Sequence, residues 1–230
     1  MNYLLEVCTA SIRSVEAAAK AGAKRIELCS ALSLDGLTPS IGMIRLVKER
    51  FPLLTLHVLV RPREGNFVYN ELELATMESD IHLCRQAGAD GIVIGALTAE
   101  GDIDMPAMQR LMAAAEGLPV TFHRAFDVCR HPEEALEQII GLGCCRILTS
   151  GQAATAEQGI PLLHRLHQQA QKRIIIMPGG GVNAANAISI LQQTGCQEIH
   201  ASASSIYPDG LKDTDTRKVA GILQSLLTTS

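Results

Sequence analysis

Gly22-Ala23-Lys24-Arg25-Ile26 is a phrase in which a glycine and a small residue are followed by two variable residues and an isoleucine that opens an apolar run. The same phrase recurs at Gly88–Ile92, Gly143–Ile147 and Gly195–Ile199. A glycine ends a helix at the least conformational cost because it lacks Cβ, and isoleucine is enriched in strands. We interpret each phrase as the passage from a helix into a strand, which is the connection that parallel strands require.

The stretches between these phrases are long enough for one more strand and one more helix each. Apolar runs occupy the expected places: Tyr3–Val7, Leu54–Val60, Val120–Phe122 and Arg173–Met177. The sequence therefore predicts eight strands alternating with eight helices. We expect a single α/β domain over residues 1–230 with the architecture of a TIM (β/α)8 barrel, for which about 250 residues are typical. A doubly wound open sheet is the alternative.

Composition and charge argue against several classes of protein. The formal net charge is −4, tryptophan is absent and only 3% of residues are aromatic, so we expect no nucleic-acid partner. No apolar stretch approaches the roughly 20 residues of a membrane span, and no secretory signal is visible. The seven cysteines are scattered, and we therefore expect reduced thiols in a cytoplasmic protein. The sequence is compatible with a homo-oligomer and with a monomer.

Polar side chains recur at strand positions that share one face. Counting onward from the phrase glycines, the fifth and seventh positions include Glu27, Cys29, His200 and Ser202, and alternate residues of a strand point the same way. The other strands add a second set by the same logic: Glu6, Cys8, His57, Arg61 and His123. Because active sites of TIM barrels lie at the C-terminal ends of the strands, we expect one shared cavity at the barrel mouth.

Carboxylates and imidazoles in one cavity suit acid–base chemistry, since a histidine titrates near neutral pH. The candidate catalytic residues are Glu6, Glu27, His123 and His200. For any one of them a structural role is the alternative, because barrels also contain buried Glu–Arg pairs and histidines that only bond a carbonyl.

A glycine-rich turn, Pro178–Val182, follows the seventh expected strand. Glycines let backbone amides approach an anion, and barrels often bind phosphate with the loops after strands seven and eight. We predict an anion-binding site from these residues: Gly180, Gly181, Ser202, Arg61, Arg63 and Arg124. A tight turn without a ligand is the alternative for the glycines, and a solvated surface charge is the alternative for the last two arginines.

Two cysteines, Cys8 and Cys29, end neighbouring strands, where their sulfurs can approach each other at the mouth. Two thiolates form a soft site of the kind that Cu(I) prefers. The other five cysteines fall on helices or strand entries and are expected to be small core residues. The candidate metal ligands are therefore Cys8 and Cys29, and a pair of thiols without a metal is the alternative.

Seven ordered motifs resemble those of the CutC family, which is named for copper homeostasis, and they span nearly the whole chain. The motifs are as follows: Leu5–Cys8, Arg25–Cys29, Gly36–Ser40, Arg61–Arg63, Thr121–Asp127, Arg146–Gly151 and Met177–Val182. One departure is Asp35, since the family usually has a glycine before Gly36. This departure affects the expected shape of the loop after the second strand and leaves the expected fold unchanged.

The resemblance implies a single-domain TIM-type barrel in the cytoplasm that handles copper, with the thiols proposed for Cu(I) falling on Cys8 and Cys29. It does not supply a reaction, and a fold alone does not give a function. The first hypothesis is a copper homeostasis protein that binds a copper ion, Cu(I). The second is a barrel enzyme of unknown reaction, acting on a small phosphorylated or carboxylated substrate and using the same carboxylates and imidazoles if a metal assists.

Overall fold

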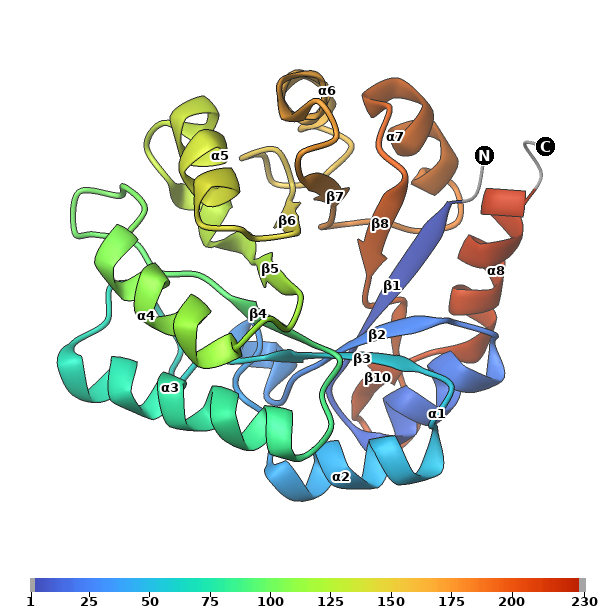
Figure 1. The fold of residues 1–230 in the computed structure, drawn as a ribbon. Helices are drawn as coiled ribbons and strands as arrows, with labels where there is room; N and C mark the ends of the chain where they lie inside the picture. The colour runs from blue at the N-terminus through green and yellow to red at the C-terminus, as the bar shows by residue number, and fades with distance from the viewer. Residues whose placement is uncertain (1–2, 228–230) are drawn as a thin grey trace.

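A computed structural model describes residues 3–227, in which helices surround a ring of strands (Figure 1). The elements of the ring alternate as follows: β1 Leu4–Thr9, α1 Ile12–Lys20, β2 Arg25–Leu28, α2 Ile41–Arg50, β3 Thr55–Leu59, α3 Glu71–Gln86, β4 Gly91–Ile94, α4 Met105–Ala115, β5 Val120–Phe122, α5 Pro132–Gly141, β6 Arg146–Thr149, α6 Ile160–Ala170, β7 Ile175–Pro178, α7 Ala187–Thr194, β8 Glu198–Ala201 and α8 Thr216–Leu227. The predicted alternation of eight strands and eight helices is confirmed.

The eight strands pair in the order β7-β6-β5-β4-β3-β2-β1-β8, and all these pairs are parallel. Each strand therefore lies beside its neighbours in the sequence, without the reversal of order that marks a doubly wound sheet. The two ends of the order, β7 and β8, meet through a parallel bridge between Gly179 and His200. The result is a nearly closed TIM barrel.

The four phrase glycines occupy the turns between helix and strand, as predicted. Gly22, Gly88, Gly143 and Gly195 have φ angles of +91°, +91°, +85° and +81°. A side chain with Cβ adopts this left-handed conformation only at a cost, so glycine at these positions lets the chain leave each helix and enter the next strand directly.

The apolar core lies between the strands and the helices. Side chains such as Leu28 and Ile94 are fully buried on the outer surface of the ring, where the helices cover them. Helix α8 contributes Val219, Ile222 and Leu226 to this layer. Inside the ring, the apolar cluster of buried residues is small and consists of four side chains: Cys8, Cys29, Leu59 and Val93. The rest of the interior is therefore available to polar groups.

A short antiparallel hairpin, β9 Ser204–Ile206 and β10 Lys212–Thr214, lies between β8 and α8 and was not predicted. It is attached to α1, because Asp213 accepts a hydrogen bond of 2.8 Å from the Ser14 hydroxyl. Two short 3-10 turns, η1 Leu32–Leu34 and η2 Arg124–Val128, lie in the loops at the barrel mouth.

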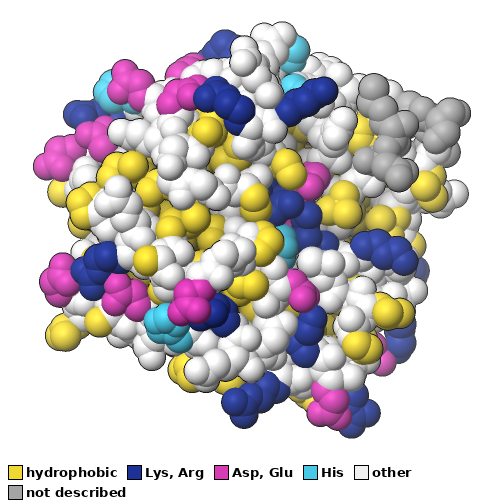
Figure 2. Space-filling model, viewed as in Figure 1, with side chains coloured by type: hydrophobic (Ala, Val, Ile, Leu, Met, Phe, Trp, Pro, Cys, Tyr) yellow, Lys and Arg dark blue, Asp and Glu magenta, His cyan; other side chains and the backbone are white. Residues whose placement is uncertain are grey.

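On the side of the molecule shown in Figure 2, acidic and basic side chains are interspersed over the surface. Across residues 3–227, every helix is too short or too polar to cross a membrane.

Candidate functional site at the barrel mouth

Strand register brings polar side chains from distant parts of the sequence together. Cys8 lies opposite Glu27, Glu27 lies opposite His57, and Glu6 lies opposite His200. Partners in register point to the same side of a sheet. All five side chains therefore face the interior of the ring, and each residue is at most 8% exposed.

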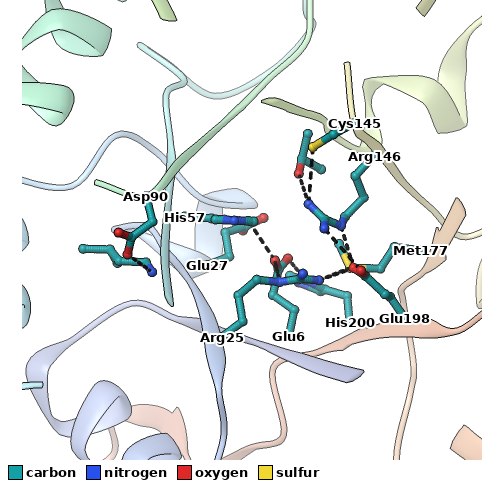
Figure 3. Close-up of polar contacts among 12 residues, drawn as sticks. Glu6, Arg25, Glu27, His57, Asp90, Cys145, Arg146, Met177, Glu198 and His200 are labelled. Atoms are coloured by element: carbon teal, nitrogen blue, oxygen red, sulfur yellow. Dashed lines mark hydrogen bonds and ion pairs between the residues drawn. The ribbon is translucent and has the colours of Figure 1, made fainter. Parts of the chain in front are cut away.

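Glu6 is the centre of an ion-pair network in the barrel interior (Figure 3). Its carboxylate oxygens lie 2.6 Å from Nε of Arg25, 3.1 Å from Nδ1 of His57 and 3.0 Å from Nδ1 of His200. Burial opposes its ionisation, but the hydrogen bonds from the two histidines and the charge of Arg25 outweigh burial and hold the pKa of Glu6 well below its usual range. The Glu6 side chain is fully buried beneath His200, and its hydrogen bond with Nδ1 fixes the orientation of that imidazole.

The network continues into the lower part of the barrel through three residues that sequence analysis did not single out. Glu198 pairs with Arg25 and with Nε of Arg146, the latter at 2.6 Å. Arg146 also donates a hydrogen bond of 3.2 Å to the hydroxyl of Thr121. Arg25, Arg146 and Glu198 are the fourth residues of three of the repeated phrases. Alternate positions of a strand share a face, so this shared position was a signal that could have revealed them.

Above this network lies a cavity of about 450 Å³ at the barrel mouth. Nine of the predicted site residues line it: Cys8, Glu27, Arg61, His123, Arg124, Gly180, Gly181, His200 and Ser202. Three others do not. Glu6 lies beneath it, Cys29 is completely buried behind Cys8, and Arg63 lies outside it. We call this space the mouth cavity.

The two predicted thiols meet at the wall of the mouth cavity. Sγ of Cys8 lies 3.9 Å from Sγ of Cys29 and 3.7 Å from Oε1 of Glu27. The neighbouring Cys29 thiol, burial, and the charges of Glu27 and Glu6 together raise the pKa of Cys8 well above its usual range. Ligand atoms of Cys8, Glu27 and His200 all lie within 4.8 Å of one another. This group offers sulfur, oxygen and nitrogen to a metal ion.

The pKa values of Glu27 and His200 are both raised, but for different reasons. Burial and the charge of Glu6 raise the pKa of Glu27, although His200 and Cys8 act against this, and Oε2 of Glu27 has no hydrogen-bond partner in the structure. Burial alone would lower the pKa of His200, but the hydrogen bond to Glu6 and the charge of Glu27 raise it. Groups with shifted pKa values in one cavity are typical of functional sites.

His123 is a neutral imidazole with a fixed tautomer. Its Nδ1 accepts a hydrogen bond of 3.2 Å from the backbone amide of Ala125, so the proton of the neutral ring resides on Nε2. Burial and the charge of Arg61 lower the pKa of His123 to about 3. The ring has room because residue 95 is glycine: a Cβ there would lie 2.6 Å from Cε1 of His123.

The loop after β3 places its two arginines differently. The guanidinium of Arg61 reaches the mouth cavity and donates hydrogen bonds of 3.0, 3.1 and 2.9 Å to the carbonyl groups of Leu34, Gly36 and Gly65. Arg63 instead donates to the Val68 carbonyl at 2.7 Å and forms an ion pair with Glu73. The guanidinium of Arg63 is engaged in holding the loop together, and the anion-binding role expected of it stays a prediction.

The glycine-rich turn after β7 lies beside Arg124. A Cβ on Gly180 would lie 3.8 Å from Cζ of Arg124, and a Cβ on Gly181 would lie 3.0 Å from a methyl group of Thr155. Arg124 is half-exposed and pairs with Asp127 at 2.7 Å. A second hollow of about 770 Å³ adjoins the mouth cavity, shares Gly181 and Ser202 with it, and extends toward Arg217 and Lys218.

Asp35 is the residue that departs from the family motif, in which a glycine usually precedes Gly36. It lines the mouth cavity, and its backbone has φ +62° and ψ +20°. Glycine adopts this left-handed region freely, whereas aspartate does so at a modest cost. Phe67 also lines the mouth cavity, with its ring centroid 4.9 Å from that of His123. The sequence assigned no role to Phe67, because an aromatic residue in a loop carries no local mark of the imidazole that it contacts.

Comparison with known proteins agrees with the motifs. Residues 3–205 match the CutC family. A family protein CutC of Bacteroides fragilis is 54% identical over 92% of this chain and 84% of the relative. The human copper homeostasis protein cutC homolog is 47% identical over 92% of this chain and 77% of the relative.

Solved structures give the same result. CutC from Streptococcus agalactiae superposes with a TM-score of 0.84 at 37% identity, covering 87% of this chain and 98% of that one. An aldolase superposes with a TM-score of 0.70 at 14% identity, covering 98% and 96% of the two chains, which shows a shared fold alone. The chain described here therefore belongs to the CutC family.

Proposed function

We propose that this protein binds a copper ion, Cu(I), through Cys8 and Cys29 at the wall of the mouth cavity. The observation that carries the proposal is the separation of 3.9 Å between the two sulfur atoms. Soft thiolate ligands favour Cu(I) over harder ions, and the human relative is named a copper homeostasis protein. The donor set on this chain is therefore of the right chemistry for the ion that the family name implies.

The surroundings of the thiols define the conditions for binding. The two thiols are buried beside carboxylates, so Cu(I) must displace their protons when it binds. Cys8 faces the mouth cavity and provides the route of entry, while Cys29 lies behind it. All seven cysteines are free thiols, which supports an assignment to the cytoplasm, where thiols remain reduced.

A competition titration with a chromophoric Cu(I) chelator under anaerobic conditions tests this proposal. We expect the parent protein to remove Cu(I) from the chelator and both Cys8→Ser and Cys29→Ser to lose that ability. Cys145→Ala is the matched control, because this thiol lies at the entry of β6 and donates to the Val120 carbonyl at 3.2 Å. Equal Cu(I) affinity in the parent and in the Cys8→Ser, Cys29→Ser double variant would refute the assignment.

A metal-assisted barrel enzyme is the second candidate, and the grouping of Cys8, Glu27 and His200 favours it. Three protein ligands of this kind with an open position are typical of catalytic Zn²⁺ sites. The ion would supply Lewis acidity at the mouth cavity, and the Glu6 carboxylate would orient His200 through Nδ1. The catalytic assignment of Glu27, His123 and His200 belongs to this second proposal.

Cys29 separates the two candidates. It belongs to the thiol pair but not to the group formed by Cys8, Glu27 and His200. If the first candidate is correct, Cys29→Ser should abolish Cu(I) binding. If the second is correct, Cys29→Ser should leave Zn²⁺ binding intact. Calorimetry with each ion measures both affinities. A protein that binds Zn²⁺ no better than its Cys8→Ser variant would rule out the mixed-donor site.

A further inference from the structure

Arg61 differs from every other buried arginine in residues 3–227. Three arginines are at most 6% exposed: Arg25, Arg61 and Arg146. Arg25 and Arg146 form ion pairs with buried carboxylates. The guanidinium of Arg61 donates hydrogen bonds to three loop carbonyl groups and interacts with the Tyr69 hydroxyl, and no carboxylate in the described part of the chain pairs with it. A buried charge without a counter-ion is unfavourable, so the fold holds a cation ready at the wall of the mouth cavity.

His123 supplies a second donor to the same cavity. The proton on Nε2 is fixed by the bond that Nδ1 accepts from Ala125, and Nε2 has no partner although the residue is 5% exposed. Buried N–H groups are nearly always hydrogen-bonded in native proteins. Because His123 lines the mouth cavity, a ligand or solvent atom held there can complete the hydrogen bonding of this donor.

The two donors both lie close to the aromatic ring of Phe67. The guanidinium carbon of Arg61 is 5.0 Å from the centroid of Phe67, and the His123 ring is 4.9 Å from it. Glu27 requires a hydrogen-bond donor, because its Oε2 also has no partner among the described residues. The mouth cavity thus offers a cation and an N–H donor on the Phe67 side and a carboxyl oxygen beside Cys8.

We propose that the mouth cavity binds a small hydroxylated anion, whose carboxylate or phosphate oxygens contact Arg61 and His123 and whose hydroxyl group contacts Glu27. The oxygen atoms of such an anion accept hydrogen bonds, and its negative charge would be the counter-charge to the Arg61 guanidinium. The volume of about 450 Å³ suits a metabolite-sized molecule. This inference goes beyond copper binding, needs no metal, and names the kind of substrate that an enzyme with this cavity would take.

Four related probes test the proposal by calorimetry in metal-free Tris buffer: glycerol, D-glycerate, glycerol 3-phosphate and inorganic phosphate. We expect D-glycerate or glycerol 3-phosphate to bind and glycerol to give no heat. If one of the two anions binds far better, it identifies the oxyanion as carboxylate or phosphate. The proposal fails if neither anion binds better than glycerol, or if inorganic phosphate binds as well as both, because the hydroxyl contact would then be absent.

Variants assign the binding to the two donors. Arg61→Met and His123→Phe should each lower the affinity for the anion by roughly tenfold or more, since each removes a hydrogen bond to a charged group. Arg165→Met is the control, because Arg165 lies on α6 outside the mouth cavity and forms an exposed ion pair with Glu133. The Arg165→Met protein should bind the anion with the affinity of the parent.

His123→Phe keeps the test decisive if Arg61→Met does not fold, and near-UV circular dichroism checks each variant. Unchanged affinity in a folded His123→Phe protein would overturn the proposal. An equal loss of affinity in Arg165→Met would overturn it too.

Discussion

The lower interior and the mouth of the barrel both contain charged and imidazole side chains, but these side chains have different numbers of partners in the two regions. Below, Glu6 has Arg25 and two histidines within 2.6 to 3.1 Å, and Arg146 has Glu198. At the mouth, Arg61 has no counter-ion and His123 has an unpartnered Nε2. Paired groups in the interior specify a unique arrangement, whereas unpaired groups at the mouth cost stability and provide binding capacity. The comparison predicts that the lower interior stabilises the fold and that the mouth binds a ligand.

Glu6→Gln breaks the comparison on the lower side and should have the largest effect. Removing the carboxylate leaves Arg25 and two imidazoles without their common anion, and losing one partner of a buried pair costs about 3–5 kcal/mol of the free energy of unfolding. Urea denaturation measures it. Glu137→Gln is the control, because the ion pair of Glu137 with Arg173 is exposed, and its stability should match that of the parent. A Glu6→Gln protein as stable as the control would show that the network is not structurally important.

His123 makes the mouth sensitive to acid. Its pKa is about 3 in the folded protein and 6.5 in an unperturbed state, so between these values the unfolded chain binds a proton that the folded protein does not. The free energy of unfolding therefore decreases as pH falls below 6.5, by up to about 1.4 kcal/mol per pH unit from this group.

Comparison of the parent with His123→Phe isolates this contribution. From pH 6.5 to 5, the parent should lose about 2 kcal/mol relative to the variant, as measured by urea denaturation at each pH. Parallel pH profiles for the two proteins would mean that His123 is not kept neutral by burial.

Gly95→Ala tests the space on which the His123 ring depends. The added Cβ would lie 2.6 Å from Cε1 and Nδ1 of His123, so the ring must move, and overpacking of this kind costs about 1–3 kcal/mol. Gly141→Ala is the matched control, since its Cβ would meet no atom within 4 Å. We expect lower thermal stability only in Gly95→Ala. A fully stable Gly95→Ala protein would show that the imidazole is not confined.

Asp35→Gly should have the smallest effect. It relieves the left-handed backbone at φ +62°, which stabilises the fold, while the greater freedom of glycine in the unfolded chain offsets part of the gain. We expect an increase of about 0.5 kcal/mol in the free energy of unfolding. A clear loss of stability would indicate that the Asp35 side chain contributes an interaction at the mouth that outweighs its backbone strain.

Much of the architecture was predictable because it follows from local patterns. The phrase glycines marked the helix ends, and the alternation of residues on strands predicted that Glu27 and His200 face inward. The repeated phrases could have placed Glu198 on the inner face, but they could not show that it pairs with two arginines, because those partners lie on other strands. The contrast between Arg61 and Arg63 was equally invisible, since two arginines separated by one proline in a loop look alike until the loop is folded.

The sequence by itself determined the ring of parallel strands, because the repeated passages from helix to strand depend on glycine geometry and apolar periodicity within a few residues. Only the tertiary structure decided which polar groups obtained partners. Glu6 and His200, for example, are 194 residues apart in the chain and 3.0 Å apart in the barrel. Electrostatic interactions act through distance in space, so the difference between a structural charge pair and an unfilled binding site is not encoded in any single stretch of sequence.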